Sequence, residues 1–179
     1  MHDRRPRDCF HIIRQVALTI FLTGLPVIAA AATYHQIFGW IEWVTFPDIG
    51  LRLKTKLDTG AETSSLHAMN IVRFKREGDR MVRFDLTNPE SGEIFTMELD
   101  LERSVRIREH DGSYQRRPVV DMWICIGSLR KKIEVNLVDR TQFHYPFLLG
   151  RSAMKGAVVV DPGETFTAEG RCGERSTAR

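Results

Sequence analysis

Apolar and polar residues alternate along several short segments, and this pattern restricts the fold more than any other feature of the sequence. Leu51–Leu57 reads LRLKTKL, which places Leu and Thr on one face of a strand and three basic side chains on the other. One helical turn is predicted at residues 152–155. Many short strands with few helices predict a β-sandwich or a closed barrel. The other predicted strands are residues 41–46, 81–86, 94–101, 105–109, 119–126, 133–138, 147–149 and 157–160.

Turn-forming residues separate these segments and join some of them into hairpins. Residues 88–92 read NPESG, and they connect 81–86 to 94–101. Gly127 and Ser128 connect the predicted strands 119–126 and 133–138 in the same way. No internal repeat or linker divides the chain, so one core domain is expected over residues 37–166. Residues 167–179 are polar, and we expect them to form a frayed tail.

The amino-terminal residues have the pattern of an export signal. Residues 1–15 are rich in Arg, and residues 16–32 carry no charge and end in four Ala residues. The uncharged run has 17 residues and contains Gly24 and Pro26, whereas a membrane span needs about 20. We therefore expect a signal peptide over 1–32, cleaved near Ala32, with an uncleaved anchor as the alternative. The first interpretation predicts a periplasmic protein, and the second a domain anchored to the inner membrane.

The charge balance argues against a nucleic-acid partner. The chain has 26 basic and 23 acidic residues, a net charge of +3. Residues 1–32 contain four Arg and two Asp, so 22 basic and 21 acidic residues remain, a net charge of +1. So weak a field has little long-range attraction for phosphate. Contact with a membrane is expected only through the amino-terminal segment.

The three Cys residues leave two interpretations open. Cys9 falls in the predicted signal, Cys125 in an apolar strand and Cys172 in the polar tail. Cys125 and Cys172 can form a disulfide in an oxidising compartment. Alternatively, Cys125 is a small buried apolar residue. No pair has the CxxC spacing of a structural zinc site.

Two motifs carry the candidate chemistry. The first is Leu57-Asp58-Thr59-Gly60-Ala61, in which an alternating strand runs directly into an Asp followed by small residues. Small residues let a carboxylate sit at a tight backbone corner and let a second backbone come close. The second motif is the apolar triplet Phe147–Leu149 followed by Gly150 and Arg151. Each is weak alone, but the two in this order and at this separation are specific.

In these motifs the chain resembles the retropepsins, the single-lobe aspartic proteases. It is most similar to the bacterial retropepsin-like family labelled "ATP-dependent zinc protease", or RimK-associated. The similarity rests on LDTGAETSSLHA at 57–68, RPVV at 117–120, FLLGRSAM at 147–154 and VVVD at 158–161. It implies an all-β closed barrel with one lobe per chain and one short helix near the carboxyl terminus. The sequence has no HExxH, no His pair at i, i+4 and no phosphate-binding Gly loop, so we expect no metal and no cofactor.

The resemblance also implies a homodimer and a mechanism. The family uses two Asp residues that share a proton and activate water, and this chain supplies one Asp-Thr-Gly. Asp58 of each protomer is therefore expected to meet its copy at the twofold axis. The charged carboxylate would act as general base on water, and the protonated one would polarise the scissile carbonyl. Thr59 would hold the two loops together, and Gly60 would present its backbone to substrate.

The remaining site residues are also carried over from the family. Ala61 and Glu62 are expected to line the substrate site, and Gly150 and Arg151 to support the loop. Glu62 and Arg151 are predicted to form an ion pair that braces the loop, with Glu62 as a solvated loop residue as the alternative.

The flap over the substrate is expected at about residues 108–116. Its tip would include Asp111 and Gly112, and Tyr114 would be the residue facing the site. This segment carries more charge than a viral flap.

Three functions follow from these features. The leading hypothesis is an exported aspartic endopeptidase that hydrolyses peptide bonds with an Asp58 pair. The second is a non-catalytic module of the same fold that binds peptide or a partner protein at the cell envelope. The third is a cytoplasmic peptidase that works with an ATP-grasp ligase, against which residues 16–32 argue.

Overall fold

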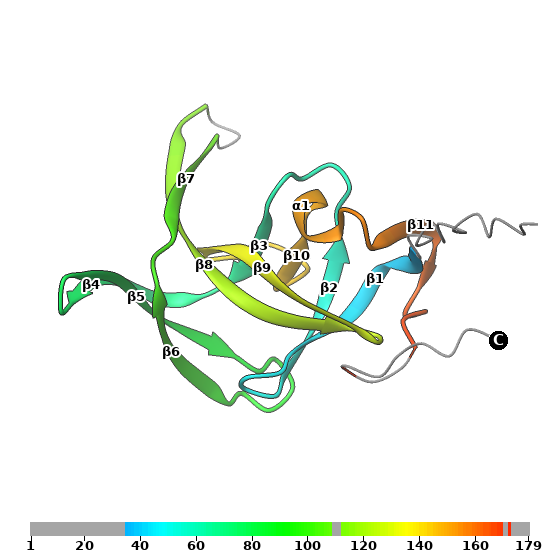
Figure 1. Cartoon of the computed structure of the whole chain (residues 1–179), viewed down its shortest axis with the longest axis horizontal. Coiled ribbons are helices and arrows are strands. Elements are labelled where there is room, and N and C mark those ends of the chain that lie inside the picture. The colour runs from blue at the N-terminus through cyan, green and yellow to red at the C-terminus, as the bar shows by residue number, and fades with distance from the viewer. Residues whose placement is uncertain (1–34, 109–111, 170–171, 173–179) are drawn as a thin grey trace, which may run out of the picture. The chain divides into compact units, whose positions relative to one another are not determined.

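The computed structural model describes residues 35–108, 112–169 and 172, and strands dominate it (Figure 1). Residues 1–34, which include the predicted signal, lie outside the described residues, as does the predicted flap residue Asp111. The strands are β1 (Gln36–Phe46), β2 (Leu51–Leu57), β3 (Ser64–His67), β4 (Met69–Arg76), β5 (Asp79–Thr87), β6 (Ile94–Asp100), β7 (Arg103–Arg108), β8 (Tyr114–Ile126), β9 (Leu129–Val138), β10 (Phe147–Leu149) and β11 (Val158–Thr165). The single helix of the described residues is α1 (Arg151–Met154).

Six strands close into a barrel in the order β1-β2-β10-β3-β9-β8. The ring is completed by a pairing of β1 with β8, in which Thr45 faces Cys125. Two further strands extend the same sheet, since β11 pairs parallel to β1 and β7 pairs antiparallel to β8. The expected all-β barrel with one short helix is therefore confirmed.

A second sheet, in the order β4-β5-β6, packs on the barrel. Its central strand β5 alternates as predicted, and Val82, Phe84 and Leu86 are buried in the same apolar cluster as the barrel core. Phe95 and Met97 of β6 pack against this cluster from the edge. The hairpin predicted over residues 81–101 is confirmed by the β5–β6 register.

Strands β3 and β4 were not predicted. Residues 64–66 lie in no predicted strand, but they pair with β10 on one side and β9 on the other. Their polar groups can be buried because each finds a partner: the Ser64 hydroxyl accepts a hydrogen bond from the Gly150 N–H at 3.2 Å. β4 lacks a clear alternation, and its register with β5 shifts between Met69 and Val72.

A buried carboxylate holds the carboxyl-terminal segment to the barrel. Glu42 on β1 is 1% exposed. It accepts hydrogen bonds from the N–H groups of Gly39 and Thr167 at 2.8 Å and of Ala168 at 3.2 Å. Four residues further on, Cys172 is joined to Cys125 by a disulfide. The expectation of a frayed tail over residues 167–179 therefore does not hold for Thr167, Ala168 and Cys172, because these contacts fix them.

None of the helices among the described residues has the length and apolar character of a membrane span.

Candidate active site

Asp58 follows the last residue of β2 and is fixed by backbone contacts. Its N–H donates to the Leu149 carbonyl on β10 at 2.9 Å, which continues the pairing of these two strands. Its carboxylate Oδ1 accepts the Gly60 N–H at 2.9 Å. The small residues after Asp58 therefore let the chain turn back and hydrogen-bond the carboxylate.

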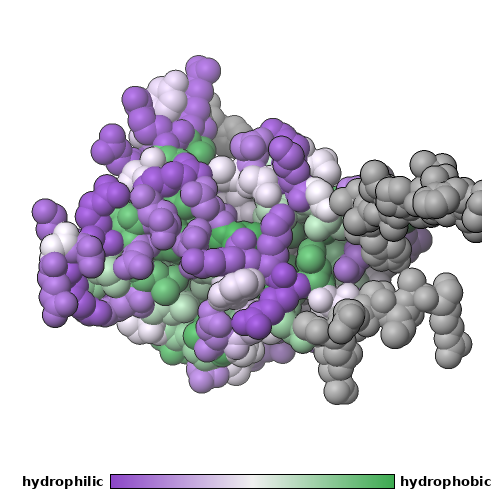
Figure 2. Space-filling view, in the orientation of Figure 1, coloured by the Kyte–Doolittle hydropathy of each residue, from purple (hydrophilic) through white to green (hydrophobic). Residues whose placement is uncertain are grey.

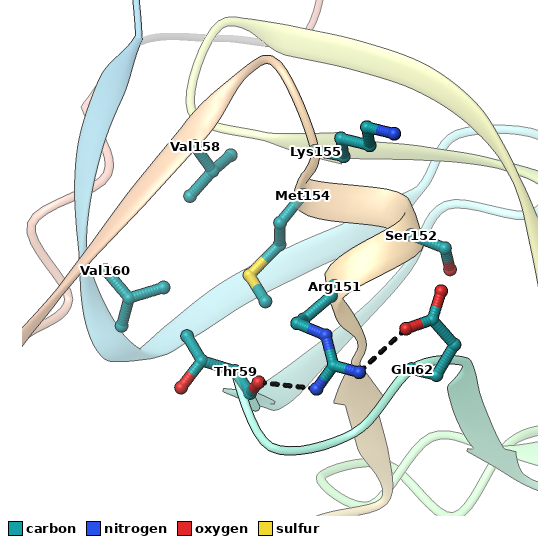
Figure 3. A pocket seen from close by; sticks show the side chains of 8 residues that line it. All are labelled: Thr59, Glu62, Arg151, Ser152, Met154, Lys155, Val158 and Val160. Atoms are coloured by element: carbon teal, nitrogen blue, oxygen red, sulfur yellow. Dashed lines mark hydrogen bonds and ion pairs between the residues drawn. The ribbon is translucent and has the colours of Figure 1, made fainter.

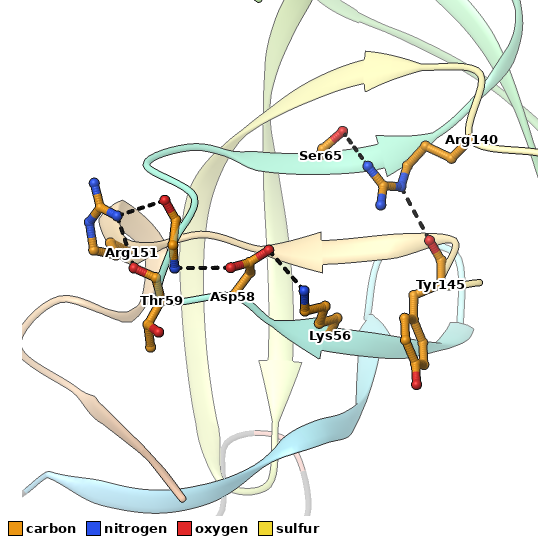
Figure 4. A network of polar contacts seen from close by, with 8 residues as sticks. Lys56, Asp58, Thr59, Ser65, Arg140, Tyr145 and Arg151 are labelled. Carbon is orange, nitrogen blue, oxygen red and sulfur yellow. Dashed lines mark hydrogen bonds and ion pairs between the residues drawn. The ribbon is translucent and has the colours of Figure 1, made fainter. Parts of the chain in front are cut away.

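Lys56 is the charged neighbour of this carboxylate. Its Nζ lies 3.3 Å from Asp58 Oδ2 (Figure 4). Partial burial raises the pKa of Asp58, but the Gly60 N–H, the Lys56 ammonium and the Ala61 N–H together outweigh burial. The pKa of Asp58 consequently lies below its ordinary value, and in the single chain the group is anionic at neutral pH.

Arg151 braces the loop that carries Asp58. Its Nη1 donates to the carbonyls of Thr59 and Gly60, both at 2.9 Å. Its Nη2 donates to Glu62 Oε2 at 2.8 Å, so the predicted ion pair of Glu62 and Arg151 is present. The carbonyl contacts fix the loop backbone, whereas the ion pair lies at the surface.

Gly150 allows the two motifs to come together. A Cβ atom at this position would lie 2.6 Å from the carbonyl carbon of Thr63 and 2.9 Å from the carbonyl oxygen of Glu62. The N–H groups of Arg151 and Ser152 donate to the carbonyls of Ala61 and Glu62 at 2.9 and 3.1 Å. Only Gly leaves room for this contact, which explains the Gly after the apolar triplet.

Two cavities flank the loop. One of about 440 Å³ is lined by Thr59, Glu62, Arg151 and Ser152 on its polar side (Figure 3). Its apolar side consists of Met154, Val158 and Val160, with Lys155 at the margin. The Asp58 carboxylate lines the other cavity, of about 320 Å³.

The second cavity contains residues that were not predicted for the site. The segment between β9 and β10 supplies Arg140, Phe143, His144 and Tyr145. Trp40, Lys56 and Leu148 complete the lining with Asp58. The sequence does contain a signal for Lys56. It lies two residues before Asp58, and residues two apart on a strand face the same side. No local signal identifies Arg140, which reaches the site only through the β9–β10 connection.

The predicted flap region includes the ends of β7 and β8, which form a hairpin. β7 and β8 pair from Arg103 and Val119 to Arg108 and Tyr114. The hairpin projects from the barrel, and its surface is largely hydrophilic (Figures 1 and 2). Gly112 has a φ of +83°, and an added Cβ would meet no atom within 4 Å. Tyr114 is exposed and stacks with Arg106 at 4.6 Å.

The structure thus brings together Asp58, Thr59, Gly60, Ala61, Glu62, Gly150 and Arg151. Gly112 has none of these residues within 4 Å of the position of an added Cβ. Across residues 35–108, 112–169 and 172, no group of three His, Cys, Asp or Glu side chains is arranged to hold a metal ion.

A closed barrel with an Asp-Thr-Gly loop braced by a Gly-Arg element defines a retropepsin-like protein. The sequence profile of the RimB-like family, described as retropepsin-like aspartic endopeptidase RimB, matches residues 37–171. The chain belongs to this family.

Similar proteins include one of known structure and several much longer ones. A crystal structure of a protein of unknown function from Legionella pneumophila is 36% identical, with a TM-score of 0.67, and the match covers 76% of this chain and 100% of that one. A probable alpha-L-glutamate ligase of Shewanella pealeana is 37% identical over 133 residues, 73% of this chain and 29% of the ligase. A protein of the same name from Parasynechococcus marenigrum is 39% identical over 134 residues, 73% of this chain and 28% of that protein. The chain therefore spans less than a third of these two relatives.

Proposed function

We propose that this protein is an exported aspartic endopeptidase that hydrolyses peptide bonds with a pair of Asp58 carboxylates in a homodimer. The observation that carries the proposal is the Asp58 carboxylate. It is fixed by the Gly60 N–H at 2.9 Å, lies on a loop braced by Arg151 and faces a cavity. A rigid carboxylate at the wall of a cavity is the arrangement that general acid–base hydrolysis requires.

The mechanism needs two protonation states. In the single chain, Asp58 is anionic, so it can take a proton from water. A second Asp58 at close range raises the pKa of one member of the pair, because two adjacent carboxylates cannot both ionise easily. The protonated member then polarises the scissile carbonyl while the charged member activates water. The pair titrates as a unit.

The dimer proposal is supported by surface left uncovered near the loop. β11 is one of the two edge strands of the barrel sheet, and Val159 on it is 49% exposed. Val158 and Val160 line the 440 Å³ cavity beside Thr59. A second copy placed against this edge would cover apolar side chains and bring the two Thr59 loops together.

Export is supported by the disulfide. Cys125 and Cys172 are 47 residues apart in the sequence and are bonded in the folded chain. Such bonds persist in oxidising compartments and are rare in the cytoplasm. This pairing agrees with the export pattern of residues 1–32. The periplasm is the proposed location, with attachment to the inner membrane as the alternative.

The relatives suggest the substrate class. Two proteins that contain a region similar to this chain are named probable alpha-L-glutamate ligase. We propose a polypeptide that contains glutamate residues as the substrate. The same names are consistent with the alternative of a cytoplasmic peptidase that acts beside a ligase. Finding the protein with an intact amino terminus in the soluble cytoplasmic fraction would support that alternative.

A non-catalytic peptide-binding module is the second candidate. It is favoured by the ion pair between the Lys56 ammonium and Asp58 Oδ2, 3.3 Å apart in the single chain. This contact takes up the carboxylate oxygen that a catalytic base would use. This candidate predicts a chain that stays monomeric and binds peptide without turnover.

The test compares the full chain with its Asp58→Asn variant on a mixed peptide library from acidic to neutral pH, with products read by mass spectrometry. Cleavage by the wild type alone supports the peptidase. Equal cleavage by both excludes Asp58 as the catalytic group. No cleavage by folded wild type supports the binding module.

A further inference from the structure

Arg140 is a buried cation next to the candidate catalytic carboxylate. It is 7% exposed and follows β9 in the segment that leads to β10. Its Nη1 donates to the Ser65 hydroxyl at 3.2 Å, and its Nε donates to the Tyr145 carbonyl at 3.2 Å (Figure 4). The Phe143 ring lies 4.4 Å from the guanidinium carbon. All three partners are neutral.

No carboxylate neutralises this guanidinium in the described part of the chain. The ion pairs there join other residues, and Asp58 attracts Arg140 without coming within ion-pair distance. Burial lowers the pKa of Arg140, and the neighbouring Arg117 adds to this effect. A desolvated charge with only neutral partners is costly unless an anion pairs with it.

The cavity beside Arg140 has the size and lining for such an anion. Its volume is about 320 Å³, near the lower limit of small-ligand sites. Arg140 and Lys56 supply positive charge, and Trp40, Tyr145 and Leu148 supply apolar walls. A glutamate side chain has the same division, with apolar methylenes and a carboxylate tip. Because Asp58 lines the same cavity, a residue bound here lies beside the scissile bond.

We propose that Arg140, together with Lys56, is a specificity-determining residue that binds the carboxylate of an acidic substrate side chain next to Asp58. This inference rests on the proposed peptidase function and adds to it the groups that select the substrate. The planar guanidinium can donate two parallel hydrogen bonds to a carboxylate, and the Lys56 ammonium adds charge. A neutral amide of the same shape would leave Arg140 unpaired.

The test uses two peptides that differ only in Glu or Gln beside the cleaved bond, with kcat/KM measured for the full chain. We expect the wild type to prefer the Glu peptide by about 10- to 100-fold, the range for a hydrogen bond between charged groups. Arg140→Met should remove most of this preference, and Arg140→Lys should restore part of it. Lys56→Gln, at a more exposed position, should reduce the preference even if Arg140→Met fails to fold. Arg52→Met removes a positive charge from the same face of β2 away from the cavity and should leave the preference unchanged.

The outcomes separate this inference from the proposed function. Wild-type cleavage of both peptides at equal rates overturns the inference and leaves the peptidase standing. A preference that persists in both Arg140→Met and Lys56→Gln also overturns it. If no peptide is cleaved, binding of the two peptides to the wild type is measured by fluorescence anisotropy. Tighter binding of the Glu peptide that is lost in Lys56→Gln supports the pocket although the peptidase fails, and equal binding overturns the pocket as well.

Discussion

Lys56 and Asp58 face the same side of the chain at the end of β2, with 3.3 Å between Nζ and Oδ2. The relationship follows from strand geometry, since residues two apart point the same way. The carboxylate also accepts the Gly60 N–H. The ammonium therefore stabilises the ionised form of the candidate catalytic group before any partner or substrate arrives.

Replacing Lys56 by Met should raise the pKa of Asp58. In the folded wild type this pKa is below its ordinary value of 3.8, so ionised Asp58 contributes stability above about pH 3.8 and the contribution is lost as pH falls through the folded pKa. The variant loses the Lys56 contribution but keeps the two N–H contacts. Carboxyl ¹³C NMR titration measures the shift. An Asp58 pKa that does not move in Lys56→Met would contradict the ion pair.

Arg151→Ala should cost more stability than Glu62→Gln. The ion pair of these residues is exposed, with relative side-chain exposures of 49% and 70%, and such pairs contribute below about 1 kcal/mol. The contacts of Arg151 with the Thr59 and Gly60 carbonyls are lost only in Arg151→Ala, and we expect a loss of about 1–3 kcal/mol. Urea unfolding compares the two variants. Equal losses would show that the ion pair, and not the carbonyl contacts, braces the loop.

Gly150→Ala should destabilise the fold by about 1–3 kcal/mol, because its Cβ would collide with backbone that has no room to move. Gly163→Ala is the matched control. Its Cβ would lie 3.3 Å from the flexible Asp161 carboxylate. Thermal unfolding of both variants measures the difference. A Gly150→Ala variant as stable as Gly163→Ala would mean that the two motifs do not pack as described.

Cys172→Ser should lower the free energy of unfolding by about 2–4 kcal/mol, since the disulfide closes a loop of 47 residues. With reductant present, wild type and variant should unfold at nearly the same denaturant concentration. Urea titrations with and without reductant test this. Identical stability without reductant would contradict a disulfide that anchors the carboxyl-terminal segment.

The barrel strands could be predicted wherever alternation is uninterrupted. The bounds of β2 and β10 agree with the prediction because Leu51–Leu57 and Phe147–Leu149 carry a clear apolar pattern. β3 was missed because its buried Ser64 and Ser65 are satisfied by partners far along the chain. Single-sequence patterns contain no information about such partners.

The candidate site also contains both residues that the sequence identifies and residues that it does not. The loop residues from Asp58 to Glu62 could be identified because their motif is local. The wall of the cavity could not, because Arg140 is placed by the β9–β10 connection and is buried against Ser65 and Tyr145. Glu42 was also missed, since a carboxylate on a predicted strand is expected at the surface.

The central claim is that two Asp58 carboxylates from two chains form one active site. A fixed amount of wild-type full chain is mixed with a tenfold excess of Asp58→Asn, allowed to exchange subunits, and assayed on a cleaved peptide with substrate in excess. Most wild-type chains then pair with an inert partner, so activity should fall about tenfold. Arg52→Met in place of Asp58→Asn should cause no such loss. Activity that stays unchanged under excess Asp58→Asn would contradict a shared carboxylate pair.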